Sequence, residues 1–304
     1  MATEITPIAG SSSRFADYIR LLKPRVMSLV VFTALAGLLM APGAIHPLDG
    51  FISICAIAIG AGAAGAINMW YDRDIDAMMR RTLNRPLPAG RLHPTEALLL
   101  GVTLSCLSVS TLTLISNYLS GILLAVTIFY YVVLYTIWLK RKTPQNVVIG
   151  GVSGALPPVV GWTAVTGSID LGAILLFAII FLWTPPHSWA LALFRHEDYS
   201  AADIPMLPVA QGRKATGQQI LFYSLLLVIV TLAPMPFGLA GAFYEVAAVA
   251  LGVGFAFYAL QLFRSLSNKD SAETDAETAK KLFKYSIRYL FLIFLFLLID
   301  SYLI

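Results

Sequence analysis

The stretch FISICAIAIGAGAAGAINMWYDRDID, residues 51–76, decides the fold class of this sequence. Residues 51–71 contain no charged side chain. A helix needs roughly 20 mostly apolar residues to cross the hydrocarbon core of a bilayer. Charge then begins abruptly at Asp72. The stretch is therefore predicted to be a membrane-spanning helix that runs into a polar, charged loop.

The composition of the whole chain agrees with this interpretation. Of its 304 residues, 58% are hydrophobic and 12% are charged, and the mean hydropathy is +0.77. Soluble domains have about 25% charged residues. These values exclude a disordered chain, a collagen-like chain and an ordinary water-soluble enzyme. The predicted fold class is all-α, a polytopic membrane protein.

Nine stretches of suitable length are predicted to cross the membrane. The fifth is rich in glycine and proline, which spans tolerate when they pack against other helices. The stretch 267–281 has mixed charge and is expected to be a solvated connector. The nine predicted spans are 25–42, 51–71, 95–115, 119–139, 147–166, 170–192, 219–238, 243–263 and 284–303.

The basic residues support this count. All 21 lysines and arginines fall into five groups, each separated from the next by two predicted spans, and the intervening connections contain none. The positive-inside rule then places the N-terminus and every second connection in the cytoplasm, and the C-terminus on the opposite side. Residues 1–22 are expected to form a loosely ordered cytoplasmic tail, and residues 23–304 a single nine-helix domain.

The first charged loop begins with regularly spaced oxygen-bearing side chains. Asn68, Asp72 and Asp76 lie four residues apart, so they share one face if the helix continues, whereas Asp74 points elsewhere. Mg²⁺ prefers oxygen ligands and often bridges carboxylates to substrate phosphates. Polar groups so near the end of an apolar span are costly and usually functional. These three residues are therefore predicted to be catalytic and metal-binding.

Basic side chains gather on the same predicted side of the membrane. Guanidinium and ammonium groups hold phosphate oxygens through charge-assisted hydrogen bonds. Two interpretations stay open, because these residues either bind a diphosphate or act only as topology anchors. The candidate diphosphate-binding residues are Arg81, Arg85, Arg91, Lys140, Arg141 and Lys142.

A later loop, WTPPHSWALALFRHEDYSAADIPMLP at 183–208, adds histidines and acids. His187 follows two prolines inside a predicted span, where it is either a packing residue or a functional one, such as an iron ligand or a proton carrier. The candidate iron-binding residues are His187 and His196, and the candidates for a second cation site are Glu197, Asp198 and Asp203, with Asp198 also a catalytic candidate.

Several of these strings resemble a known family. The motif N-x-x-x-D-x-x-x-D at 68–76, followed by NRPLPAGR at 84–91, resembles the intramembrane aromatic prenyltransferase superfamily. Longer strings are similar to one branch, the protohaem IX farnesyltransferases or haem O synthases, over nearly the whole chain from about residue 20. They are KPRVMSLVVFTALAGLLMAP at 23–42, TPQNVVIGG at 143–151, TPPHSWALALFRHEDY at 184–199 and IPMLPV at 204–209.

The resemblance implies a bundle of nine helices around a central cavity that opens sideways to lipid, in the inner membrane of a bacterial cell. It implies transfer of a farnesyl group from farnesyl diphosphate to a vinyl group of haem b, with addition of water, to give haem O and diphosphate. Mg²⁺ is the implied cofactor. The implied partners are farnesyl diphosphate, haem b, the lipid bilayer, and haem A synthase or terminal-oxidase assembly proteins, with no nucleic acid. The aromatic residues expected to face the cavity are Trp70, Tyr130, Tyr131 and Trp189.

One departure from the family pattern weakens part of this prediction. Related prenyltransferases carry a second Asp-x-x-x-Asp motif, but here Ala201 and Ala202 stand four residues after Glu197 and Asp198. The alternative is a prenyltransferase of the same superfamily that acts on a quinone precursor or a chlorophyll-like ring, and the broken motif argues against it. A transporter is disfavoured, because the chain lacks the matched halves with interrupted helices typical of that class.

Overall fold

The computed structural model describes residues 14–268 and 272–303, and this part of the chain is helical throughout, without a strand. The predicted all-α class is therefore confirmed. The helices are α1 (Arg14–Leu21), α2 (Pro24–Met40), α3 (Pro47–Tyr71), α4 (Arg73–Asp76), α5 (Pro94–Ile115), α6 (Tyr118–Phe129), the π-helix η1 (Tyr130–Leu139), α7 (Asn146–Ala155), α8 (Pro157–Thr166), α9 (Leu171–Phe194), α10 (His196–Ala201), α11 (Leu207–Ala210), α12 (Gly212–Thr231), α13 (Ala242–Ser267) and α14 (Ala272–Asp300).

In the described residues, eight helical stretches are long and apolar enough to cross a membrane, and α1 with α2, bent by 46°, makes a ninth when the pair is counted as one span. The number of spans matches the sequence prediction. The seventh and the last spans differ clearly from the prediction. The seventh span begins at Gly212 and ends at Thr231, seven residues before the predicted end, because Pro234 and Pro236 cannot continue a helix.

The last span differs more, because the expected connector is helical from Ala272 onward. The Asp275 side chain explains this. It is 4% exposed and pairs with Arg213 at the start of α12 at 2.9 Å, and it accepts a hydrogen bond from Ser265 of α13. Contacts with two neighbouring helices therefore hold the first turns of α14 in place.

The fifth span, rich in glycine and proline, breaks at Leu156 into α7 and α8. Its small residues let α8 touch the backbone of α2. A Cβ atom placed on Gly161 would stand 2.1 Å from the Ala34 carbonyl oxygen, and one on Gly37 of α2 would stand 2.1 Å from the Pro158 carbonyl oxygen. Close backbone approach through small residues is the usual way in which membrane helices pack.

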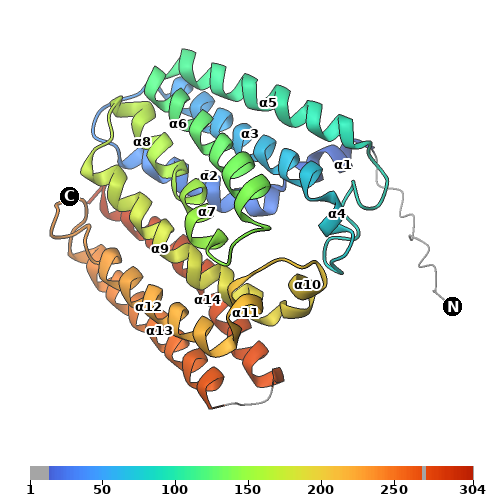
Figure 1. Cartoon of the computed structure of the whole chain (residues 1–304). Helices are drawn as coiled ribbons and strands as arrows, with labels where there is room; N and C mark the ends of the chain where they lie inside the picture. The colour runs from blue at the N-terminus through green and yellow to red at the C-terminus, as the bar shows by residue number, and fades with distance from the viewer. Residues whose placement is uncertain (1–13, 269–271, 304) are drawn as a thin grey trace.

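The short helices mark one end of the bundle. Figure 1 shows α4, at the end of α3, and α10 and α11, which follow α9, at the same end as α1, whereas the end of α14 lies at the opposite end of the long helices. The long connections predicted to carry the chemistry are therefore gathered on one side of the molecule. The start of α1 and the end of α14 lie on opposite sides, as an odd number of spans requires.

Residues 14–21 are part of the folded unit, which corrects the expectation of a loose tail over this stretch. They form α1, and Leu21 is fully buried. Asp17 is 2% exposed and accepts from Arg91 of the loop after α4, at 3.0 and 3.1 Å. Two hydrogen bonds and a buried leucine hold α1 against the bundle, which the polar composition of this stretch did not indicate. The rest of the predicted tail, residues 1–13, lies outside the described residues.

A cavity of about 620 Å³ lies among the helices, with walls from α2, α3, α6 to α9, η1 and α14. Its wall includes Val26 of α2 and Ile287 of α14, which are 63% and 41% exposed, so the cavity reaches the lateral surface of the bundle. The lining is mainly apolar, and its larger polar side chains are Arg25, Tyr131, Tyr135 and His187. This matches the predicted bundle around a central cavity.

Candidate active site

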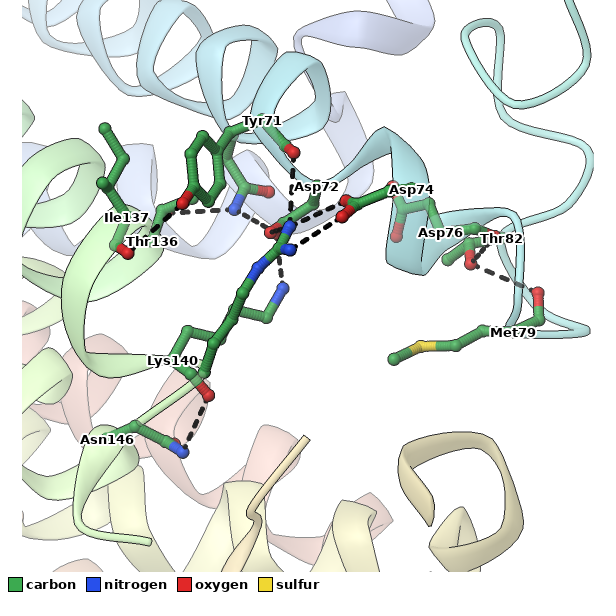
Figure 2. A network of polar contacts seen from close by, with 12 residues as sticks. Tyr71, Asp72, Asp74, Asp76, Met79, Thr82, Thr136, Ile137, Lys140 and Asn146 are labelled. Atoms are coloured by element: carbon green, nitrogen blue, oxygen red, sulfur yellow. Dashed lines mark hydrogen bonds and ion pairs between the residues drawn. The ribbon is translucent and has the colours of Figure 1, made fainter. Parts of the chain in front are cut away.

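A buried polar cluster lies at the end of α3, and we define it as Lys23, Asn68, Asp72, Thr136 and Lys140. The Asn68 amide nitrogen donates to Asp72 Oδ2 at 2.8 Å and to Thr136 Oγ1 at 3.1 Å, and its Oδ1 accepts from Lys23 Nζ at 2.6 Å. Figure 2 shows Lys140 reaching Asp72 from the end of η1, and its Nζ lies 2.5 Å from Asp72 Oδ2. Asn68 and Asp72 are 4% and 1% exposed.

The π-helix η1 brings two members of the polar cluster to α3. The Lys140 amide donates to Tyr135 O at 2.9 Å, five residues earlier, and Thr136 Oγ1 donates to Tyr131 O at 2.8 Å. Such wide turns are rare and occur frequently at functional sites. Because Tyr131 and Tyr135 line the cavity, η1 forms a wall shared by the cavity and the polar cluster.

Arg141 joins two carboxylates of the first charged loop. It holds Asp74 with two hydrogen bonds of 2.7 Å, and one of its nitrogens lies 3.6 Å from Asp72 Oδ1. Its guanidinium group also stacks over the Tyr71 ring, 4.8 Å from the centroid. The hydrogen bonds from Arg141 hold the pKa of Asp74 below its usual range. The Asp74 side chain is 59% exposed, so it points away from the polar cluster, as predicted.

The predicted helix does not continue straight through the motif. Helix α3 ends at Tyr71, Asp72 adopts φ −83° and ψ 5°, and α4 begins at Arg73. The amide of Asp76 still donates to Asp72 O at 2.8 Å. However, the Asp76 carboxylate lies apart on α4 (Figure 2) and pairs with Arg85 at 2.6 Å. The buried carboxylates therefore belong to two neighbouring ion pairs rather than to one.

The basic candidates divide into two sets. Lys140, Arg141 and Arg85 contact the acidic motif, as described above. Arg91 instead binds Asp17 of α1 and the Asn84 carbonyl oxygen, at 2.8 Å for the latter, and Lys142 is exposed. The structure therefore gives Arg91 a role in holding α1, away from the polar cluster.

The second acidic loop approaches the first through Arg81. Its guanidinium carbon lies 5.8 Å from the centroid of the Tyr199 ring of α10. The neighbouring Asp198 is 9% exposed, whereas His196, Glu197 and Asp203 are exposed. Asp198 is thus the buried acidic residue of this loop, next in sequence to the Tyr199 that contacts Arg81, and the surface positions of His196, Glu197 and Asp203 do not contribute to an enclosed site.

His187 lies deeper, in the wall of the cavity. Its ring stacks on Trp183, with centroids 4.2 Å apart, and on Phe283, with centroids 4.6 Å apart. Nδ1 lies 2.7 Å from Ser286 Oγ of α14. Of the four aromatic residues predicted to face the cavity, Tyr131 lines it in the described structure, and Trp189 is 1% exposed within the core on the other side of α9.

The acidic side chains suit a divalent cation that is shared with an anion. Asp72 Oδ1 and Asp198 Oδ2 are buried carboxylate oxygens that have no hydrogen-bond partner within the described residues. In the same part of the chain, no three histidine, cysteine or acidic side chains lie close enough to enclose an ion. An ion bound at either carboxylate would therefore need oxygens from a bound anion, which is the usual arrangement for Mg²⁺ with phosphates.

Sequence reasoning missed Lys23 and Thr136, both partners of Asn68. Lys23 lies in the quoted string KPRV but was assigned only to the basic group that orients the first span. Thr136 sits inside an apolar span. A threonine within a run of large apolar and aromatic residues was the one signal for it, and that signal is weak because threonine hydroxyls often bond their own helix.

Comparisons with known proteins agree with this architecture. A curated relative from Parvibaculum lavamentivorans, named protoheme IX farnesyltransferase, is 54% identical over 96% of this chain and 91% of its own length. A solved structure of digeranylgeranylglyceryl phosphate synthase superposes with a TM-score of 0.78 at 19% identity, over 96% of this chain and all of the other. A UbiA homologue from Archaeoglobus fulgidus, bound to DMAPP and Mg²⁺, gives 0.61 at 16% identity, over 90% of this chain and 99% of its own.

The structural neighbours show a shared fold, and the sequence matches define the family. The family model described as UbiA prenyltransferase family matches residues 30–287, the region that contains most of the cavity lining and four of the five residues of the polar cluster. This chain is an integral membrane protein with several spanning helices, and it belongs to the UbiA prenyltransferase family.

Proposed function

We propose that this enzyme transfers the farnesyl group of farnesyl diphosphate to a vinyl group of haem b, with addition of water, and so produces haem O and diphosphate. The relative from Parvibaculum lavamentivorans, named for this reaction, supports the choice of substrates. The observation that carries the proposal is the adjacency of the polar cluster to an apolar cavity through η1, because the reaction needs a charged site for diphosphate beside a dry site for the isoprenoid.

Breaking the allylic C–O bond leaves negative charge on diphosphate and a delocalised cation on the isoprenoid. Lys140, Arg141 and Arg85 already stand at the acidic motif, where donors placed in advance stabilise charge that develops in the transition state. Asp72, Asn68 and Asp198 are the residues that would hold Mg²⁺. Bound there, the ion would neutralise the charge developing on the leaving diphosphate.

The cavity supplies the second requirement. Tyr131 and Tyr135 line it on the side of the polar cluster, and their rings stack with centroids 5.6 Å apart. Aromatic faces attract cations, and they do so more strongly when water is excluded. These two tyrosines would shield the allylic cation until the vinyl carbon attacks it. Water then adds to the cation left on the porphyrin side chain and loses a proton, which leaves the hydroxyl.

The haem acceptor would occupy the part of the cavity lined by His187, which is our candidate haem-binding residue. His196 is a poorer candidate because its side chain is exposed. The charge pattern of the loops supports an N-terminus and an active site on the cytoplasmic side of the bacterial inner membrane. There the product would pass to haem A synthase or to proteins that assemble terminal oxidases.

The test offers two acceptors to the purified enzyme. The full chain in lipid nanodiscs receives farnesyl diphosphate and Mg²⁺ with either haem b or 4-hydroxybenzoate, and products are identified by mass. We expect a haem adduct heavier by a farnesyl group plus a hydroxyl, which together are the elements of farnesol, and no prenylated benzoate. Prenylation of 4-hydroxybenzoate alone would assign the enzyme to the quinone branch of the family instead.

A further inference from the structure

The His187 ring is held on three sides. Trp183 covers one face and Phe283 the other, so both π-faces are closed to a ligand. The Nδ1 edge contacts Ser286, which is fully buried. Trp183 is fixed in turn, because its Nε1 donates to the Ser286 carbonyl oxygen at 2.8 Å. A ring held in this way offers the cavity one polar atom, Nε2, in the plane of the ring.

The hydrogen bonds of Ser286 also set which nitrogen carries the proton. Ser286 Oγ lies 2.7 Å from the Phe283 carbonyl oxygen and 2.7 Å from His187 Nδ1. A hydroxyl has one proton, and a carbonyl oxygen only accepts. Both contacts are hydrogen bonds only when Ser286 donates to Phe283 and His187 Nδ1–H donates to Ser286. The proton on Nδ1 leaves Nε2 with a lone pair.

We propose that Ser286 is a positioning residue that keeps His187 in the Nδ1–H form, so that Nε2 binds the iron of the haem acceptor from the cavity side. The inference rests on haem b being the acceptor. Metal-binding histidines commonly donate their second nitrogen to a fixed acceptor, which orients the ring and selects the coordinating nitrogen. An axial ligand approaches along the lone pair in the ring plane, the direction that the two aromatic faces leave open.

The main competing explanation is that this arrangement only packs α9 against α14. A packing role predicts that loss of the Ser286 hydroxyl changes stability but not the iron ligand. Ser224 provides a matched control, because it is also a fully buried helical serine, and its Oγ donates to Ile220 O at 2.6 Å. Ser224 lies on α12, which does not line the cavity.

The experiment titrates ferric haem b into the full chain in lipid nanodiscs and records absorption and electron paramagnetic resonance spectra. Wild type and S224A should show a histidine-ligated iron. H187G should lose this signature and regain it when imidazole is added. S286A should bind haem about 10–100-fold more weakly, with an altered ligand signature, and S286T, which keeps a hydroxyl, should restore the wild-type signature.

Four outcomes would overturn the inference alone, and a fifth would overturn the proposed function as well. A wild-type spectrum from H187G without imidazole would remove His187 as ligand, and S286A with wild-type affinity and spectrum would remove Ser286 as a positioning residue. Equal losses in S286A and S224A would reduce the effect to packing. Haem O formation by wild type without a histidine-ligated spectrum would refute this inference alone, whereas absence of both haem binding and haem product would refute the proposed function as well.

Discussion

Replacement of Asp72 by asparagine tests the polar cluster most directly. The change removes one negative charge and keeps the shape of the side chain. Asp72 faces Lys140 at 2.5 Å, Arg141 at 3.6 Å and the Asn68 amide at 2.8 Å. At an effective dielectric constant of about 20, unit charges 3.6 Å apart interact by about 4–5 kcal/mol. That value is the gross attraction, before the cost of desolvating either charge is subtracted.

The expected effect on catalysis is larger than the effect on folding. Loss of one preorganised charge-stabilising group typically lowers kcat by about 10²–10³-fold, or about 2.7–4 kcal/mol. The kcat of D72N should therefore fall by at least about 10²-fold. Breaking a fully buried ion pair costs about 3–5 kcal/mol of stability. Here Lys140 is 16% exposed and is able to turn towards water, so the free energy of unfolding should fall by about 1–2 kcal/mol.

The assay compares D72N with D74N in nanodiscs, measuring haem O formation against farnesyl diphosphate and Mg²⁺ concentration. Asp74 is a matched control, because it stands two residues away and also pairs with Arg141, but its side chain is 59% exposed. An exposed pair is worth about 0–1 kcal/mol, so D74N should lose less than about fivefold. D72N should in addition need more Mg²⁺. Equal losses in the two variants, or full activity in D72N, would show that burial beside Lys140 is irrelevant to the chemistry.

Three further substitutions probe the fold and the limits of the site. G161A should lower stability by about 1–3 kcal/mol in thermal unfolding, because its Cβ would stand 2.1 Å from a backbone oxygen of α2, whereas G154A meets nothing within 4 Å and should not. T136V should slow turnover and cost about 1–3 kcal/mol of stability, since a buried amide donor loses its acceptor; unchanged kcat would exclude a role in the site. R91A should speed proteolysis within α1 while leaving turnover nearly intact, and a loss of activity above about tenfold would restore Arg91 to the diphosphate site.

The transmembrane architecture could be predicted well because its signals are local. A run such as 51–71 indicates its own place in the membrane, and the five basic groups predict an orientation without knowledge of any contact. The errors arose where a contact decides the outcome. Helix α14 begins at Ala272 because Asp275 contacts Arg213 and Ser265 from two other helices. The polar composition of residues 267–281 taken alone favours a loop instead.

The candidate site could be predicted in part for the same reason. Spacing alone brought together Asn68 and Asp72, which lie four residues apart on one helix. Lys23 stands 45 residues from its partner Asn68, and Thr136 stands 68 residues away. Thr136 reaches α3 from the π-helix η1. The sequence does not reveal this register, because residues 130–139 are apolar or aromatic except for Thr136 and therefore mark no single face. Partners that depend on packing were therefore the ones missed.

The ion pairs of the first loop also explain how a site with so much buried charge is stable before substrate binds. Asp72 pairs with Lys140, and Asp76 pairs with Arg85, so the cost of an isolated buried charge is avoided. A diphosphate that arrives with a divalent cation brings charges of both signs. Its oxygens would take over Lys140 and share Arg85 with Asp76, while the cation takes over Asp72, and each buried group would keep a partner throughout. Because the donors do not have to be assembled during the reaction, little reorganisation opposes the departure of the leaving group.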